Sequence, residues 1–167
     1  MKNILGVLLL AFFLHSCDDG DMTLQSFNFD SQSVLKCSDT NLLYKINDSE
    51  ALLLSLPEGT LPTEETPDDE PLELSVNSSH KIIYRKYSDN VTSSSFCGEI
   101  PPATPVVTNE WNANGGFIII ITDYLYDSSN EIIGLTHNIT FQNVSLEGGG
   151  ETFNFETYIF GNYEEEF

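Results

Sequence analysis

Hydrophobic and polar residues alternate one by one along most of this chain, which is the pattern of strands with one face in a core. The last third shows it most clearly. Every second residue of the stretch Ile133–Phe141 is apolar or is His137, and the residues between them are mostly polar. The apolar positions then move to Val144 and Leu146. This shift of phase predicts a β-bulge near Gln142-Asn143.

Turn residues divide the last third into long consecutive strands. Asp127–Asn130 and Gly148–Gly150 are typical of hairpin loops, so we expect an antiparallel meander of three strands. Asn114–Gly116 predicts a further tight hairpin turn. The run Phe117–Thr122 that follows is almost continuously apolar, which is typical of a central strand buried on both faces.

Shorter strand-like stretches occupy the first two thirds of the chain. They cover residues 23–29, 42–46, 50–56, 72–76, 80–87 and 107–113. Together with the meander they predict an all-β fold, an antiparallel β-sandwich of immunoglobulin-like or related type, with a closed β-barrel as the alternative. The Cys-Trp-Cys order of true immunoglobulin domains is absent, because Trp111 follows both Cys37 and Cys97.

One segment interrupts this pattern. Residues 57–71 hold four prolines and six acidic side chains but a single leucine. Such a composition buries little apolar surface, so we expect a solvated, mobile loop between two strands. Its carboxylates are hard oxygen donors, which makes a Ca²⁺ site the alternative, although their spacing matches no EF-hand loop.

The start of the chain has the pattern of a targeting segment. Lys2 precedes an uncharged apolar run, Ile4–Leu14, that is too short to span a bilayer as a helix and is typical of a signal peptide. The sequence Leu14-His15-Ser16-Cys17 resembles the lipobox, the cleavage site of bacterial lipoproteins. The resemblance implies that residues 1–16 are removed and that Cys17 receives lipid. An ordinary cleaved signal or an uncleaved anchor is the alternative.

Acidic residues follow Cys17 directly, at Asp18, Asp19 and Asp21. This cluster resembles the surface-export signal of lipoproteins in the Bacteroidota. The resemblance implies an outer-membrane lipoprotein of the cell envelope, exposed on the cell surface. A plain solvated spacer is the alternative interpretation of the same residues.

Cleavage before Cys17 leaves enough residues for one domain with a sizeable core. We expect a lipidated tether over residues 17–22, a single β domain over 23–163 and a frayed acidic tail over 164–167.

The chain is strongly acidic, with six Lys and Arg against 26 Asp and Glu and a formal net charge of −20. Nucleic acid and anionic lipid headgroups are therefore poor partners, because both are bound by clustered basic side chains. The expected partners are the membrane, through the lipid anchor, and an envelope protein or a glycan.

Two cysteines remain if Cys17 carries lipid. Thiols outside the cytoplasm usually pair, so we expect a disulfide between Cys37 and Cys97. Free buried thiols are the alternative. Two cysteines without a nearby pair of histidines do not complete a zinc site, and we expect no metal and no cofactor.

The sequence contains none of the motifs GxSxG, HExxH, GxGxxG or the P-loop, and we expect no enzyme activity. Asp123, Tyr124, Tyr126 and Asp127 are weak ligand-binding candidates, because acidic and aromatic side chains together bind sugars. His137 is a further candidate as a titratable group on an apolar strand face. Solvated strand ends and a hydrogen-bonded core histidine are the structural alternatives.

These observations favour a lipid-anchored, non-catalytic envelope domain that binds or assembles with a partner. The alternative is a carbohydrate- or Ca²⁺-dependent ligand-binding module. A small hydrolase built around His137 is the least favoured reading of the sequence.

Overall fold

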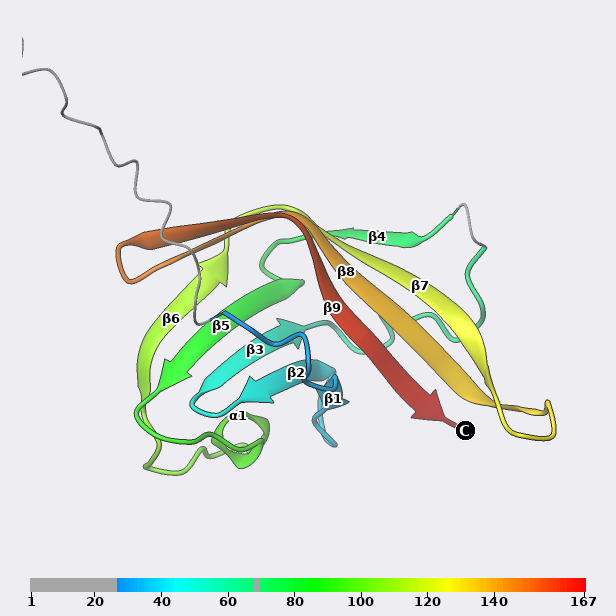
Figure 1. Ribbon diagram of the computed structural model, residues 1–167, viewed down its shortest axis with the longest axis horizontal. Helices are drawn as coiled ribbons and strands as arrows, with labels where there is room; N and C mark the ends of the chain where they lie inside the picture. The colour runs from blue at the N-terminus through cyan, green and yellow to red at the C-terminus, as the bar shows by residue number, and fades with distance from the viewer. Residues whose placement is uncertain (1–26, 68–69) are drawn as a thin grey trace, which may run out of the picture.

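A computed structural model describes residues 27–67 and 70–167, which form nine strands and one short helix (Figure 1). The elements are β1 (Leu35–Lys36), β2 (Leu42–Asn47), β3 (Glu50–Ser55), β4 (Leu72–Ser75), β5 (Lys81–Tyr87), α1 (Ser94–Cys97), β6 (Val107–Ala113), β7 (Phe117–Tyr126), β8 (Ile132–Gly148) and β9 (Glu151–Glu166). The expected signal peptide, the tether and Cys17 lie outside the described residues.

All strand pairs are antiparallel and belong to one sheet with the order β1-β2-β3-β5-β6-β8-β7-β4, in which β9 pairs with β8 as well. The sheet folds over on itself, so that β2, β3 and β5 lie beneath the arc of β7, β8 and β9 (Figure 1). It does not close, because no ladder joins the strands at its ends. The predicted antiparallel β-sandwich is confirmed, and the closed-barrel alternative is wrong.

Strand β8 carries the fold from one layer to the other. It pairs with β7 as far as Gln142 and with β6 at Leu146 and Glu147. Asn143, between these ladders, has a left-handed φ of 53°, and the buried side chains shift from Phe141 to Val144. The buried face therefore changes where the sequence pattern indicates, but the predicted β-bulge at Gln142-Asn143 is wrong. The β8–β9 register continues across these residues without an extra residue, and the left-handed conformation of Asn143 causes the change of face.

The predicted hairpin turn at Asn114–Gly116 is wrong. Strands β6 and β7 do not pair with each other, because both pair with β8. The three residues instead form a corner opposite the bend of β8. Gly116 has a φ of 98°, and a Cβ there would lie 2.6 Å from the carbonyl oxygen of Asn143, so glycine is required. The hairpins at Asp127–Asn130 and Gly148–Gly150 and the β7–β8–β9 meander are confirmed.

Two apolar clusters stabilise the sheet. The main core lies between the layers and includes Phe29, Tyr84 and Trp111, whose ring stacks on Tyr84 at 4.9 Å. A second cluster, which contains Tyr44 and Leu53, includes the residues around the disulfide. Strands β2 and β3 are therefore buried on both faces.

Strand β7 differs from the expectation that both of its faces are buried. Ile118 and Ile120 are in the core, whereas Ile119 and Ile121 are half-buried. An apolar run alone does not distinguish these cases, because isoleucine also suits an open sheet face.

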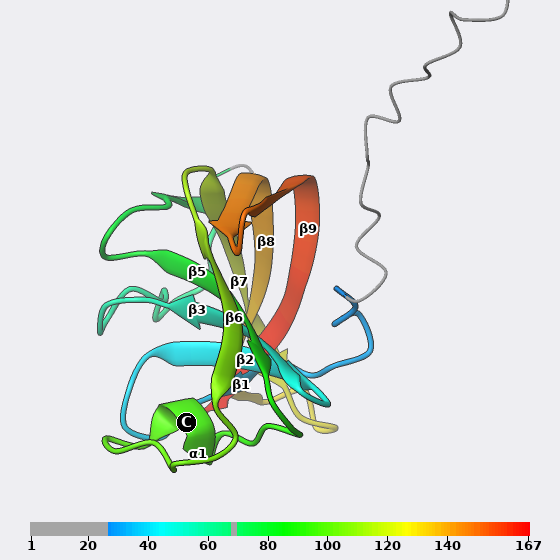
Figure 2. The same ribbon diagram turned by 90° about the vertical axis from the view of Figure 1, so that its left-hand side faces the viewer.

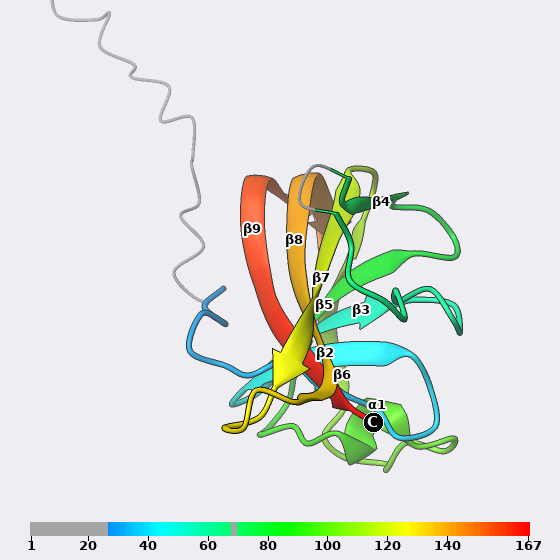
Figure 3. The same ribbon diagram turned by 90° about the vertical axis from the view of Figure 1, so that its right-hand side faces the viewer.

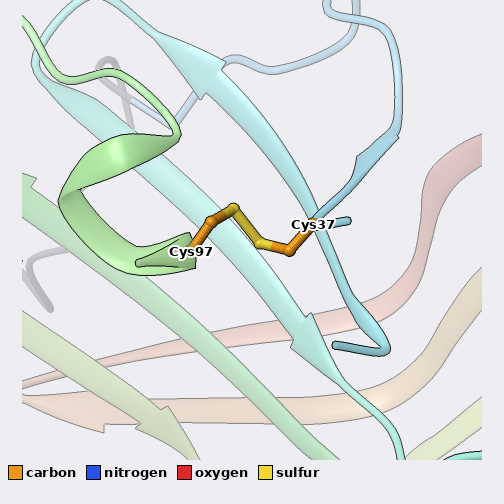
Figure 4. The surroundings of a disulfide bond; sticks show 2 residues. All are labelled: Cys37 and Cys97. Carbon is orange, nitrogen blue, oxygen red and sulfur yellow. A yellow bond between two sulfur atoms is a disulfide. The ribbon is translucent and has the colours of Figure 1, made fainter. Parts of the chain in front are cut away.

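The predicted disulfide between Cys37 and Cys97 is confirmed, with a Cα–Cα distance of 5.4 Å (Figure 4). Cys37 directly follows β1, and Cys97 ends α1. The two residues are 60 positions apart, a separation for which chain entropy gives a stabilisation of about 4 kcal/mol. The bridge fixes α1 against the layer that contains β2.

Three further segments differ from expectation. The acidic segment 57–71 is not wholly solvated, because Leu61 is buried in the main core and Thr66 N donates to Thr122 O at 2.9 Å. Residues 164–166 are not frayed but continue β9. Residues 27–29 form no strand, although Phe29 is fully buried.

Candidate functional site

The structure does not bring the five sequence-predicted site residues together. Asp127 lies in the β7–β8 hairpin, where its Oδ1 accepts hydrogen bonds from Ser129 N and Glu131 N, both at 2.8 Å. Its carboxylate therefore stabilises the turn. Asp123 is exposed on β7, on the face that carries no core residues.

Tyr124 and Tyr126 form an edge-to-face pair at the end of β7, with ring centroids 6.5 Å apart. Tyr126 is 49% exposed and Tyr124 is half-buried. The pair is an aromatic surface feature, and neither residue lines the groove described below.

His137 is a fully buried core residue on β8. Its Nδ1 lies 2.8 Å from the Thr122 hydroxyl on β7, and its ring stacks on Tyr163 of β9 at 6.0 Å. Burial lowers the pKa of its imidazole, Glu165 raises it in part and Lys36 lowers it further. His137 is thus a hydrogen-bonded core histidine, although its partner is a hydroxyl and its Nε2 has no hydrogen bond within the described residues.

An open groove of about 620 Å³ lies where the sheet fails to close. The described N-terminal segment runs beside β9 before it reaches β1 (Figures 2 and 3). Residues 32–36, which include β1, and residues 161–164 of β9 line the groove, together with Asp30 and Lys45 of β2. Strand β1 pairs only with β2, and β9 only with β8. We call this cavity the β1–β9 groove.

A bulge in β9 shapes one wall of the groove. The β8–β9 register shifts where Ile139 faces Gly161 but Thr140 faces Ile159, which leaves Phe160 as an extra residue that is buried in the core. Gly161 has a φ of 123°, and a Cβ there would lie 3.0 Å from Val34 Cγ2 and 3.6 Å from Lys45 Nζ. Glycine therefore leaves space beside the Lys45 ammonium.

Lys45 lines the groove although the residue is only 3% exposed. It is on the same face of β2 as the core residue Leu43, and its Nζ lies 6.0 Å from the centre of the Phe160 ring. Nζ makes no hydrogen bond or ion pair with the described residues. Burial lowers the pKa of this ammonium, and Asp30 counteracts the shift from beyond ion-pair distance.

Lys45 differs in this respect from the other basic residues of the described chain. Lys36, Arg85 and Lys86 form ion pairs with Glu165, Glu110 and Glu50 at 3.4, 2.7 and 3.4 Å. Lys81 is exposed. Lys45 is therefore the buried basic residue of the described chain that has no carboxylate within ion-pair distance, although the protein carries a net charge of −20.

Lys36 forms the second positive charge of the groove. Its Nζ is 3.4 Å from Glu165 Oε1 and 5.7 Å from the centre of the Tyr163 ring. The Tyr163 ring in turn stacks on the ring of His137. This chain of contacts fixes β1 against β9 at the groove wall. Because Glu165 neutralises Lys36, Lys45 remains as the cation available to an anionic ligand.

Sequence reasoning missed the β1–β9 groove. Lys45 in NLLYKI suggests a solvent-facing position, because the opposite face of that strand is formed by Leu42, Tyr44 and Ile46. The available signals were Leu43 on the same face as Lys45, and Gly161 within a strand, where glycine often marks a bulge or a close approach.

Within the described part of the chain, no three His, Cys, Asp or Glu side chains are grouped so that they could hold a metal ion. No helix in residues 27–67 and 70–167 has the length and hydrophobicity needed to cross a membrane. Comparison with known protein families, curated proteins and solved structures finds no match to this chain.

Proposed function

We propose that this chain is a non-catalytic binding domain, anchored to the cell envelope through lipid on Cys17, that binds a carboxylate-bearing ligand in the β1–β9 groove. The observation that carries the proposal is Lys45, a buried lysine that lines an open groove and has no carboxylate of the described chain within ion-pair distance.

The energetic cost of Lys45 supports a ligand. Burial of the side chain lowers the pKa of this ammonium, and no carboxylate of the described chain pairs with it to compensate for the hydration that it loses. A carboxylate in the groove would restore the missing interaction as a charge-assisted hydrogen bond. Pairing of the carboxylate with Lys45 would then contribute to the free energy of binding.

The same geometry favours binding over catalysis. Ser33 is a hydroxyl of the groove, but the fully buried ring of His137 is not a lining residue, and its Nδ1 is engaged by Thr122. A serine nucleophile needs a base within hydrogen-bond reach. The hydrolase alternative therefore has no support from this arrangement.

The simplest test uses sodium acetate as the probe, at constant ionic strength adjusted with sodium chloride. We expect saturable shifts of the backbone amide NMR signals of β2 and β9, with a millimolar dissociation constant. Lys45→Met should abolish them, because it removes the ammonium and keeps the side-chain volume. Lys81→Met, at an exposed lysine, is the matched control and should bind like the wild type. Identical titrations of wild type and Lys45→Met would overturn the proposal.

The same variant should also be at least as stable as the wild type in the absence of ligand. Apolar replacements of buried charged groups are often neutral or stabilising, by up to about 1–4 kcal/mol. We expect an unchanged or raised melting temperature for Lys45→Met by differential scanning calorimetry, together with lost binding. A large destabilisation would instead indicate that the ammonium contributes to the fold.

The anchor rests on the lipobox resemblance and has its own test. Cys17→Ser removes the thiol that would carry lipid, so the variant should move from the detergent phase to the aqueous phase in Triton X-114 partitioning. Replacing Asp18, Asp19 and Asp21 with Ala should leave the anchor intact but protect the chain from protease added to whole cells. Unchanged partitioning of Cys17→Ser would contradict the lipoprotein assignment.

A further inference from the structure

We infer that the ligand of the β1–β9 groove is an acidic sugar of the hexuronate type, with one carboxylate and neighbouring hydroxyls. This inference rests on the proposed function, since it assigns Lys45 to the carboxylate, and it adds the chemistry of the rest of the ligand.

The charges of the groove limit the ligand to few negative charges. Lys45 is the available cation, because Lys36 pairs with Glu165 at 3.4 Å. Asp30 and Glu164 also line the groove, and their carboxylates repel a second anionic group. A phosphate ester or a strongly acidic peptide therefore fits poorly, whereas a ligand with a single carboxylate per unit fits.

The remaining surface of the groove suits hydroxyl groups. Eight of its eleven lining residues are polar or charged, among them Gln32, Ser33, Asn162 and Tyr163. An apolar side chain would leave such groups desolvated without partners. Hydroxyls can donate to carboxylates and to amide oxygens and can accept from amide nitrogens, so a polyhydroxylated ring can satisfy both kinds of group.

The size and the shape of the groove agree with a small sugar. A volume of about 620 Å³ lies within the range of small-molecule sites, which is about 300–1,000 Å³. One wall is the edge of β9 that does not pair with β8, and such an edge presents backbone N–H and C=O groups. These groups add donors and acceptors that are independent of side-chain charge.

The test compares four probes by isothermal titration calorimetry and NMR on the soluble Cys17→Ser chain. The probes are the monosaccharide galacturonate, neutral galactose, acetate and N-acetylglutamate amide. We expect galacturonate to bind at least ten-fold more tightly than each of the other three. Lys45→Met should weaken galacturonate binding at least ten-fold, and Lys81→Met should leave it unchanged.

The variant Asp30→Asn distinguishes recognition of the sugar hydroxyls from recognition of the carboxylate. It removes a repulsive charge and a strong acceptor for hydroxyls, so acetate should bind equally or more tightly, while the preference for galacturonate over acetate should fall. If acetate binds through Lys45 but galacturonate binds no more tightly, or if N-acetylglutamate amide binds best, the sugar assignment is wrong and the proposed function stands. If no probe depends on Lys45, both are wrong.

Discussion

Lys45 is the residue on which the proposed function depends most. The residue is buried and its Nζ lies 6.0 Å from the centre of the Phe160 ring, while three other basic side chains of the described chain are paired with carboxylates. The sequence shows a lysine in an alternating strand, which is ordinarily a solvent-facing residue. Only the packing of β9 and the segment before β1 over that position reveals that it is buried.

His137 should make the stability of the fold depend on pH. Burial lowers the pKa of its imidazole in the folded protein, whereas the unfolded chain titrates near 6.5. Below that pH the unfolded state binds the proton more readily, so folding stability should fall as the pH decreases from 7.5 to 5.5. His137→Gln retains a polar side chain that does not titrate. We expect its melting temperature to vary less over this window.

The environment of His137 supplies the control for that comparison. Lys36 and Glu165 face the ring from β1 and β9 with opposite effects on its pKa. Glu165→Gln leaves the lowering effect of Lys36 uncompensated, so the pH dependence of stability should become steeper in this variant. Equal slopes for wild type and His137→Gln would show that other groups set the dependence.

At the scale of elements, the acidic segment 57–71 contributes to stability at two points. Leu61 is 9% exposed and belongs to the main core. Thr66 pairs with Thr122 of β7 in both directions, since Thr122 N donates to Thr66 Oγ1 at 2.9 Å and Thr66 N to Thr122 O at 2.9 Å. The segment therefore continues the pairing of β7 beyond β4.

This packing revises what composition alone predicts for the segment. Leu61→Ala should destabilise the fold by about 2–3 kcal/mol. For a domain of this size that loss corresponds to a melting temperature lower by roughly 4–12 °C. Thr66→Ala should cost about 1 kcal/mol through the lost hydrogen bond. Glu64→Ala, at an exposed position, is the control and should change stability little; if Leu61→Ala behaves like it, the segment is solvated as its composition suggests.

Sequence patterns predicted elements well where the signal is local. The turns at Asp127–Asn130 and Gly148–Gly150 depend on neighbouring residues alone, and both are found. The change of face around Asn143 is also found, but a left-handed residue produces it and not the predicted β-bulge. Asn114–Gly116 was misjudged because a hairpin and a corner use the same residues. What separates them is whether β6 and β7 pair with each other or with β8, which is a non-local property.

At the scale of the whole molecule, the candidate site is a consequence of an incomplete sheet. Nine described strands pair in one folded sheet, yet β1 and β9 are joined by the Lys36–Glu165 ion pair rather than by a ladder. The sandwich class could be predicted because strand number and periodicity limit it. The open groove could not, because it depends on how residues more than a hundred positions apart meet.

The net charge of −20 yields the last prediction, which concerns the chain as a whole. Repulsion among 26 acidic residues opposes the compact state, and it is screened as the Debye length falls from about 30 Å at 0.01 M salt to about 10 Å at 0.1 M. We therefore expect the melting temperature to rise between 0.01 and 0.2 M sodium chloride. Calcium chloride at equal ionic strength is the control: a markedly larger rise with calcium would indicate a cation site, and no rise with either salt would show that repulsion does not limit stability.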